Sequence, residues 1–217
     1  PQMLADLRAG LDIHKVTAAS ALDIPAEQVT DKQRSQAKRI VFGLMFGMGP
    51  AKLAAQNDCS EAHARKVIRQ FFYKYPVAQS WLDQIVREAR RNGQVRSLFG
   101  RIRRLPGINH PDDEVRSEAE RQSKNSPIQS LASDMTCNAA NRIVLKFQEE
   151  SIRGKLRLLV HDAIYTEVHK DDLVKAIKII KEEMEKPIKG FNVPLIAEIK
   201  TGLRWGNMQK WGNGNGH

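Results

Sequence analysis

Apolar residues recur at helical spacing through the first part of the chain. Residues 1–10 predict a short helix, and Asp12 opens a second one. Thr30 can cap a longer helix that continues to Gly47, and the Gly-Pro pair at 49–50 supplies a stop signal directly after it. The beginning of the chain is therefore predicted to be helical.

Two more amphipathic helices are predicted after this stop. Ser60 can cap the first, which ends at Tyr75, and Pro76 begins the second, which Gly93 can end. Their apolar positions are predicted to be core: Ala64, Val67, Ile68, Phe71 and Phe72 in the first, and Trp81, Leu82, Ile85 and Ala89 in the second.

The last part of the chain adds strand signals. Two strand-like runs, 156–160 and 163–168, flank His161 and Asp162, which predicts a tight antiparallel hairpin with a carboxylate at its turn. Residues 193–200 predict a closing strand. Between them Asp171 or Asp172 caps a helix with these residues inward: Leu173, Val174, Ile177, Ile180 and Met184. Helices followed by a small sheet predict an α+β fold.

The composition of the chain predicts a polyanionic partner. The 217 residues carry a formal net charge of +10 and a pI near 9.8, which favours nucleic acid or an acidic substrate. Cys59 and Cys137 form no CxxC pair, which indicates a reducing compartment and no thiolate metal site. No apolar run approaches 18 residues or so, and no signal peptide is visible. We expect no membrane partner and a location in the cytoplasm or at the nucleoid (host cytoplasm if the source is viral).

Arg34, Lys38, Phe42 and Phe46 stand four residues apart within the long predicted helix. Each such step advances about 40° around a helix, so they form a winding stripe roughly 18 Å long, cationic at one end and aromatic at the other. That surface suits a nucleoside triphosphate, with cations for the phosphates and rings for the sugar and base. Gly43 inside the helix predicts a close approach of ligand or backbone. Taken singly, these residues also fit a solvated face and a core.

A second cationic segment follows at residues 84–104, where seven arginines stand against a single acid, Glu88. Solvated faces usually mix both signs, so this run predicts a track for a phosphate backbone. Its members are Arg87, Arg90, Arg91, Arg96, Arg101, Arg103 and Arg104. Residues 112–114 then predict an exposed loop.

Arg121, Asn125 and Gln129 are also four apart and share a helix face, although Pro127 is expected to interrupt the helix between them. Amide side chains can bond the minor-groove acceptors found at every base pair, and so test geometry without reading sequence. The alternative interpretation is an ordinary polar helix face.

Several of these segments resemble motifs of family A DNA polymerases, the DNA polymerase I type. Arg-x3-Lys-x3-Phe-Gly-x2-Phe-Gly over residues 34–47 resembles the family's fingers helix, or motif B. The family usually has tyrosine where this chain has Phe46, and often Asn where it has Val41. Asp-Ile-His at 12–14 also resembles the family, and the resemblance spans about residues 11–206.

Three further segments follow in the family's order. Residues 98–106 resemble its LFGRRR turn, and the helix with Arg121 resembles the one that contacts the primer–template. The hairpin with His161 and Asp162 resembles motif C, in which the aspartate binds a catalytic metal and the histidine sits near the primer end. Ala163 replaces the Glu that commonly follows the aspartate, which removes an accessory carboxylate but not the principal ligand.

The resemblance implies template-directed DNA synthesis on a right-hand polymerase fold. Residues 1–14 would form a palm-edge segment, 15–120 mostly helical fingers, and 121–217 the C-terminal part of an antiparallel-sheet palm. Primer–template DNA and dNTPs are the implied partners. The implied cofactor is a pair of Mg²⁺ ions, about 4 Å apart in such transfers.

The same resemblance implies residue roles. Lys38 would both hold the triphosphate and protonate the pyrophosphate leaving group, Phe42 would pack on the sugar, and Phe46 would stack near the templating base. Asp162 is the implied metal ligand and, with Lys38 and His161, a catalytic residue. The implied nucleotide-binding residues are Arg34, Lys38, Phe42, Phe46 and His14. The implied DNA-binding residues are Arg101, Arg121, Asn125 and Gln129.

One metal ligand is missing from these motifs. The family carries it in motif A, upstream of Asp-Ile-His, and nothing before Asp12 resembles that motif. We expect a second polypeptide or an upstream region to supply motif A, the thumb and the rest of the palm. The sequence fits a natural split subunit and a cropped fragment equally well. Two alternatives stay open: a fragment of a single-subunit phage-type RNA polymerase, and a non-catalytic DNA-binding or assembly module derived from a polymerase.

Overall fold

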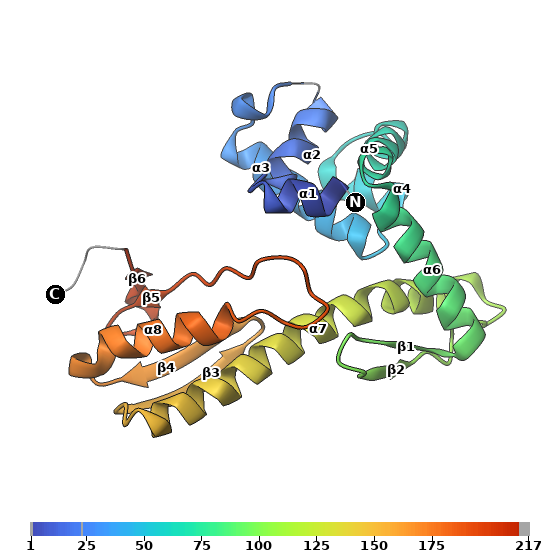
Figure 1. Cartoon of the computed structure of the whole chain (residues 1–217). Helices are drawn as coiled ribbons and strands as arrows, with labels where there is room; N and C mark the ends of the chain where they lie inside the picture. Colours follow the sequence, from blue (N-terminus) through green and yellow to red (C-terminus); the bar gives the residue numbers. More distant parts are fainter. Residues whose placement is uncertain (1, 23, 213–217) are drawn as a thin grey trace. The chain divides into compact units, whose positions relative to one another are not determined.

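The computed structural model describes residues 2–22 and 24–212 of the chain (Figure 1). Two compact units are distinguished, Pro1–Ser130 (unit 1) and Leu131–His217 (unit 2), and each is described by itself. Pro1, in the predicted palm-edge segment, and residues 213–217, in the predicted palm segment, lie outside the described residues.

Unit 1 consists of helices and one β-hairpin. Its elements are α1 (Gln2–Arg8), α2 (Ile13–Leu22), η1 (Ala26–Gln28), α3 (Asp31–Met45), α4 (Pro50–Asn57), α5 (Glu61–Lys74), α6 (Pro76–Asn92), β1 (Gln94–Arg96) and β2 (Ile102–Arg104). A long helix, α7 (Asp113–Glu149), begins in unit 1 and continues into unit 2.

Local chemistry sets these helix boundaries as predicted. Thr30 accepts a hydrogen bond from the backbone N–H of Gln33, whose side chain accepts one from the Thr30 N–H at 2.8 Å, and the pair forms a capping box for α3. The Ser60 hydroxyl caps α5 by accepting from the His63 N–H. Gly93 ends α6 in the left-handed conformation, with φ of 65°.

Three clusters of buried side chains hold the described part of unit 1 together, and the smallest, of Ala18, Val29 and Ala37, joins α2 to α3. The first joins α3, α4 and α5 through Val41, Leu44, Leu53, Ala64 and Phe71. The second packs α6 against the β1–β2 hairpin and the start of α7 through Ile85, Ala89, Val95, Leu105 and Ala119. The predicted apolar faces of α5 and α6 are thus confirmed as core, except that Trp81 is 37% exposed.

A buried carboxylate ties α1 to α5. Asp6 is 4% exposed and accepts hydrogen bonds from the Gln2 amide at 2.5 Å and the Tyr75 hydroxyl at 2.9 Å, while Lys74 Nζ lies 3.5 Å away. The Gln2 and Tyr75 bonds and the Lys74 charge hold the pKa of Asp6 below its usual value, although burial opposes this. Burial, with Asp6 as acceptor, raises the pKa of Tyr75.

Tyr75→Phe is expected to lower the free energy of unfolding by about 2 kcal/mol, because a buried carboxylate loses a hydrogen bond while keeping its charge. Urea denaturation measures the loss. Tyr73→Phe is the matched control: Tyr73 is 91% exposed, so its change should stay within about 0.5 kcal/mol. Equal losses in the two variants would contradict a stabilising role for the Tyr75–Asp6 bond.

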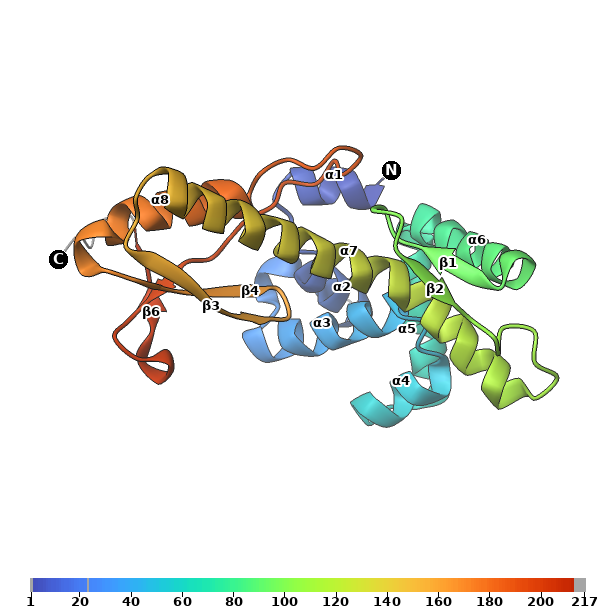
Figure 2. The ribbon, with the colours of Figure 1, turned by 90° about the horizontal axis from the view of Figure 1, so that it is seen from below.

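Unit 2 packs two helices on a β-hairpin. Its elements after α7 are β3 (Gly154–Val160), β4 (Ala163–Val168), η2 (Lys170–Asp172), α8 (Leu173–Met184), β5 (Lys200–Thr201), η3 (Trp205–Asn207) and β6 (Gln209–Lys210). Figure 2 shows α8 and the C-terminal half of α7 on one side of the antiparallel β3–β4 pair. The core between them is formed by Ile143, Phe147, Ile152, Ala176 and Ile179.

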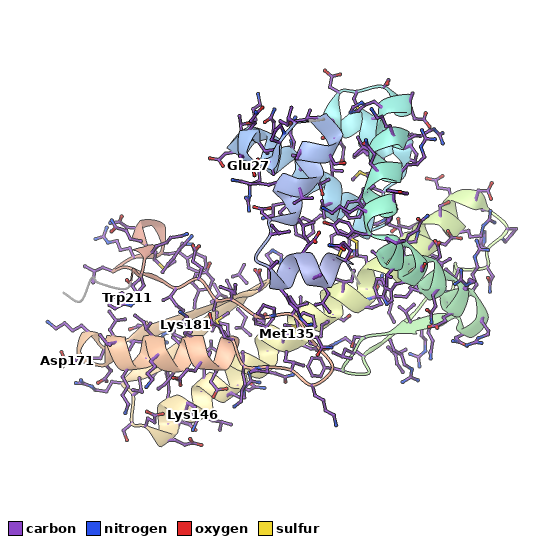
Figure 3. The ribbon with its side chains drawn as sticks, turned by 45° about the horizontal axis from the view of Figure 1, so that its top comes forward. Glu27, Met135, Lys146, Asp171, Lys181 and Trp211 are labelled. Atoms are coloured by element: carbon purple, nitrogen blue, oxygen red, sulfur yellow. The ribbon has the colours of Figure 1, made fainter. Side chains whose placement is uncertain are left out.

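Asp172 occupies the predicted cap position of α8, but its carboxylate accepts from Arg153 and makes no capping hydrogen bond. Asp171 lies just before the helix and Lys181 in its last turn, where Figure 3 labels both, so acid and base match the helix dipole. Arg142 of α7 donates from Nε to Glu183 Oε2 at 2.6 Å and from a terminal nitrogen to the Glu183 carbonyl at 2.6 Å. This partly buried pair joins α7 to α8.

The expected interruption at Pro127 is wrong. Pro127 lies inside α7, which is continuous from Asp113, so the predicted loop at 112–114 is largely its first turn. A proline inside a helix costs about 3 kcal/mol. The burial of Ala119 and Ile143 on either side of it offsets that cost.

The closing strand expected at residues 193–200 is also wrong. Only Lys200 belongs to a strand, β5, which pairs with β6. Pro194 lacks the N–H that a ladder requires, and Ile196 is 88% exposed. The helix α8 is confirmed, but Val174 is 65% exposed rather than inward. Within the described residues no helix is both long and apolar enough to cross a membrane.

Candidate nucleotide site and DNA-binding surface

The cationic and aromatic stripe predicted from the sequence lies on α3. The rings of Phe42 and Phe46 stack with centroids 6.0 Å apart and planes at 25°. Lys38 Nζ is 5.8 Å from the Phe42 centroid, a cation–π distance. Phe42 is 45% exposed, so one face of α3 presents both a cation and an aromatic ring to solvent. That combination is what a ligand with an anionic end and a flat end requires.

Helix α2 brings a histidine to the same face. The His14 ring centroid is 5.8 Å from that of Phe42. Its Nδ1 is buried and has no hydrogen-bond partner in the described part of the chain. Burying a polar atom without a hydrogen-bond partner costs free energy. The His14 Nδ1 is therefore a candidate to bond a ligand.

Asp12 contacts both His14 and Arg34, although the sequence did not single it out as a site residue. Its Oδ1 accepts from the backbone N–H groups of His14 at 2.9 Å and Lys15 at 3.1 Å and so caps α2. Its Oδ2 accepts from Arg34 Nε at 2.5 Å. The terminal nitrogens of Arg34 have no other partner within residues 2–22 and 24–212, which leaves them available for phosphate. The cap position before His14 was the one signal that could have found Asp12.

Burial favours the neutral form of His14. Burial lowers the pKa of His14, and Arg34 and Lys38 lower it further, while Asp12 raises it. Burial opposes ionisation of Asp12, but the bonds from Arg34 and Lys15 outweigh it and hold the pKa of Asp12 below its usual value. The site therefore combines two cations and a neutral imidazole with one retained anion.

Asp12→Asn is expected to lower the pKa of His14 further, because the Asp12 charge raises it. Asn can still accept from the His14 and Lys15 N–H groups, so the α2 cap is kept. A ¹H–¹⁵N NMR titration of the imidazole measures the shift. Asp31→Asn, in the exposed first turn of α3, should leave it unchanged. An upward shift in Asp12→Asn would contradict this account.

At Gly43, where a close approach is predicted, the structure places the Met48 side chain, and the Met48 N–H also donates to the Gly43 carbonyl at 2.7 Å. A Cβ added there would lie 2.6 Å from Met48 Cε. Gly47 follows α3 in the left-handed conformation, with φ of 80°, and a Cβ there would lie 2.9 Å from Lys124 Cδ of α7. The two glycines therefore serve packing at the end of α3.

The arginine-rich run forms the β1–β2 hairpin and the end of α6. Gln94 pairs with Arg104 and Arg96 with Ile102, and Gly100 supports the turn with φ of 83°. Arg101 and Arg103 are exposed beside it. Arg90 instead pairs with Glu120, and Arg103 donates to Gln122 at 3.0 Å. The hairpin thus presents arginines to solvent, but part of the predicted track is engaged internally.

Arg121, Asn125 and Gln129 share one face of α7, as their spacing predicted. Arg121 Nε donates to Glu118 at 2.7 Å, and this bond lowers the pKa of Glu118 to about 2. Asn125 Oδ1 is buried without a partner in the described part of the chain, and Gln129 is exposed. Of these two amides, the exposed one of Gln129 is accessible to an external ligand.

In unit 2, His161 and Asp162 form the two-residue turn between β3 and β4, as predicted. Val160 pairs with Ala163 across it, and His161 adopts a positive φ of 55°. Both turn side chains are exposed. Within the described residues no group of three or more His, Cys, Asp or Glu side chains could hold a metal ion. Asp162 thus presents one exposed carboxylate at the β3–β4 turn.

Residues 1–207 match the model of DNA polymerase family A. The chain belongs to this family. It is 35% identical over 206 residues to the DNA polymerase I of Caldicellulosiruptor bescii, covering 94% of this chain and 24% of that protein. To the DNA polymerase I of Geobacillus stearothermophilus it is 33% identical over 203 residues, 94% of this chain and 23% of that protein.

A solved structure of a family A relative supports the same assignment. The POL domain of Pol1 from M. smegmatis, in complex with DNA primer-template and dNTP, matches with a TM-score of 0.84 and 28% identity. The match covers 89% of this chain and 34% of that one. Family membership and the α+β class are thereby confirmed. The chain spans about a quarter of the length of the curated relatives, and the residue roles and subdomain boundaries stay predictions.

Proposed function

We propose that this family A chain carries the fingers and the C-terminal part of the palm of a template-directed DNA polymerase. The enzyme would transfer a nucleotide from a dNTP to a primer 3′-hydroxyl. The observation that carries the proposal is the α3 face, where Lys38, Phe42 and Phe46 meet His14 of α2. The M. smegmatis relative, solved with primer-template and dNTP, supports the same ligands.

On this proposal the α3 face binds the dNTP from end to end. Arg34 and Lys38 hold phosphate oxygens through charge-assisted bonds, and His14 offers its unpaired Nδ1 beside them. Lys38 also protonates the pyrophosphate as it leaves. Phe42 packs on the sugar, and Phe46, stacked on Phe42, faces the templating base.

DNA would be held by the basic hairpin and by α7. Arg101 contacts the phosphate backbone, which needs charge but no sequence information. Arg121, Asn125 and Gln129 present donors to the minor groove, where acceptors occur at every base pair.

The turn in unit 2 fits part of a magnesium site. A carboxylate is the ligand that Mg²⁺ prefers, and Asp162 presents one, with His161 beside it for the primer end. Two Mg²⁺ ions, when bound, would activate the primer hydroxyl and stabilise charge on the transferring phosphoryl group. Asp162 supplies one carboxylate. We infer that an upstream region or a second polypeptide supplies the motif A carboxylate, the thumb and the rest of the palm.

Primer extension by the assembled enzyme tests the proposal. Labelled primer–template, Mg²⁺ and either dNTPs or rNTPs are supplied in parallel, and dNTPs should be used preferentially. Equal or preferred use of rNTPs would favour the RNA polymerase alternative. The match to DNA polymerase family A favours dNTPs. DNA binding with no extension by either would favour the non-catalytic module.

A further inference from the structure

A cavity of about 160 Å³ lies within unit 1, behind the proposed nucleotide face. Helices α2, α3, α4 and α5 all contribute to its wall. From α3 it is lined by Gln33, Gln36, Ala37 and Ile40. At 100° per residue these positions lie on the opposite side of the helix from Lys38 and Phe42. A molecule in the cavity would therefore contact α3 without entering the proposed dNTP site.

The wall is mostly aliphatic, with polar groups at a few points. Ala21, Leu53 and Val67 are among its apolar members, and Asn57 and Cys59 among its polar ones. None of the residues described along the wall is Asp, Glu, Lys or Arg. His63 also lines the wall, but burying a charge among mostly aliphatic groups is expensive, which favours a neutral occupant over phosphates and other ions.

The volume of the cavity fits a single aromatic ring. An engineered apolar cavity of about 150 Å³ in another protein binds benzene. We propose that this cavity is a binding site for a small neutral aromatic molecule that carries one hydrogen-bonding group. The ring occupies the aliphatic part, and the polar substituent bonds an amide of the wall. Pockets that bind small molecules commonly combine an apolar lining with a few polar groups in this way.

The chain contains its own reporter and control for this site. Cys59 lines the cavity, whereas Cys137 is exposed in unit 2. Phenol is the probe, used at concentrations at which circular dichroism shows an unchanged fold. Its Kd is measured from the shifts of methyl NMR signals. At ten times that Kd, about one site in eleven stays open. Modification of Cys59 by N-ethylmaleimide should then slow about tenfold, while Cys137 reacts at its usual rate, as followed by peptide mass spectrometry.

Filling the cavity supplies the matched variants. Ala21→Leu places extra methyl groups in the cavity and should abolish protection of Cys59, whereas Ala62→Leu, exposed on α5 and away from the wall, should retain it. Unchanged reactivity of Cys59 in phenol, or equal slowing of both cysteines, overturns the proposal. Full protection of Cys59 by phenol in a folded Ala21→Leu variant also overturns the proposal. The comparison of the two cysteines requires no variant and no polymerase activity, so its failure would leave the proposed function untouched.

Discussion

Asp162→Ala is expected to abolish primer extension by the assembled enzyme while leaving its affinity for primer–template within a few-fold. The carboxylate at the β3–β4 turn is the proposed ligand for catalytic Mg²⁺, which contributes several kcal/mol to transition-state stabilisation. Its loss should lower the single-turnover rate by on the order of 10³-fold or more. Rapid-quench extension measures the rate, and fluorescence anisotropy measures DNA affinity.

The control for Asp162 is another exposed acid of unit 2. Glu182 lies on α8 and approaches Lys178 Nζ only to 4.0 Å, so Glu182→Ala should keep the wild-type rate. Because Asp162 is exposed at a turn, its replacement should leave the unfolding transition unchanged. A rate in Asp162→Ala close to that of Glu182→Ala would remove Asp162 from the chemistry.

Lys38→Ala is expected to impair use of the nucleotide far more than binding of DNA. Lys38 is proposed both to hold the triphosphate and to protonate pyrophosphate, and loss of a general acid alone costs about 10²–10⁴-fold in rate. We therefore expect kcat/KM for dNTP to fall by at least about 10²-fold, with KM raised and kcat lowered together. Steady-state and single-turnover extension at varied dNTP measure both effects.

Lys32→Ala provides the matched control on the same helix. Lys32 is exposed in the first turn of α3, outside the stripe, so its loss should change kcat/KM by no more than a few-fold. Equal loss of DNA affinity in Lys38→Ala and Asp162→Ala would contradict the division of labour between nucleotide binding and metal binding.

Local signals predicted much of this fold. The α3 boundaries follow from Thr30 and Gln33, which contact each other within one turn, and the β3–β4 hairpin follows from a two-residue turn between two apolar runs. Such features depend on neighbours in the sequence. The prediction at Pro127 is wrong because the local penalty of a proline is overcome by packing along α7, which no local pattern reveals.

The candidate site shows the same limit. The spacing of Arg34, Lys38 and Phe42 placed them on one face, and the structure adds the contacts that arise only in three dimensions. Asp12 reaches Arg34 across 22 positions of sequence, and Met48 folds back over Gly43. The sequence contains both residues but does not indicate that either makes these contacts.

Primer extension by this chain, alone and with an extract of its source cells, tests the central claim most directly. Purified wild-type and Asp162→Ala chains are mixed with primer–template, Mg²⁺ and dNTPs, and extension above the extract's own background is scored. On the proposal that a second polypeptide in the extract supplies the motif A carboxylate, extension is expected only for the wild-type chain with extract. Full activity of the isolated chain, or equal extension with Asp162→Ala, would contradict it.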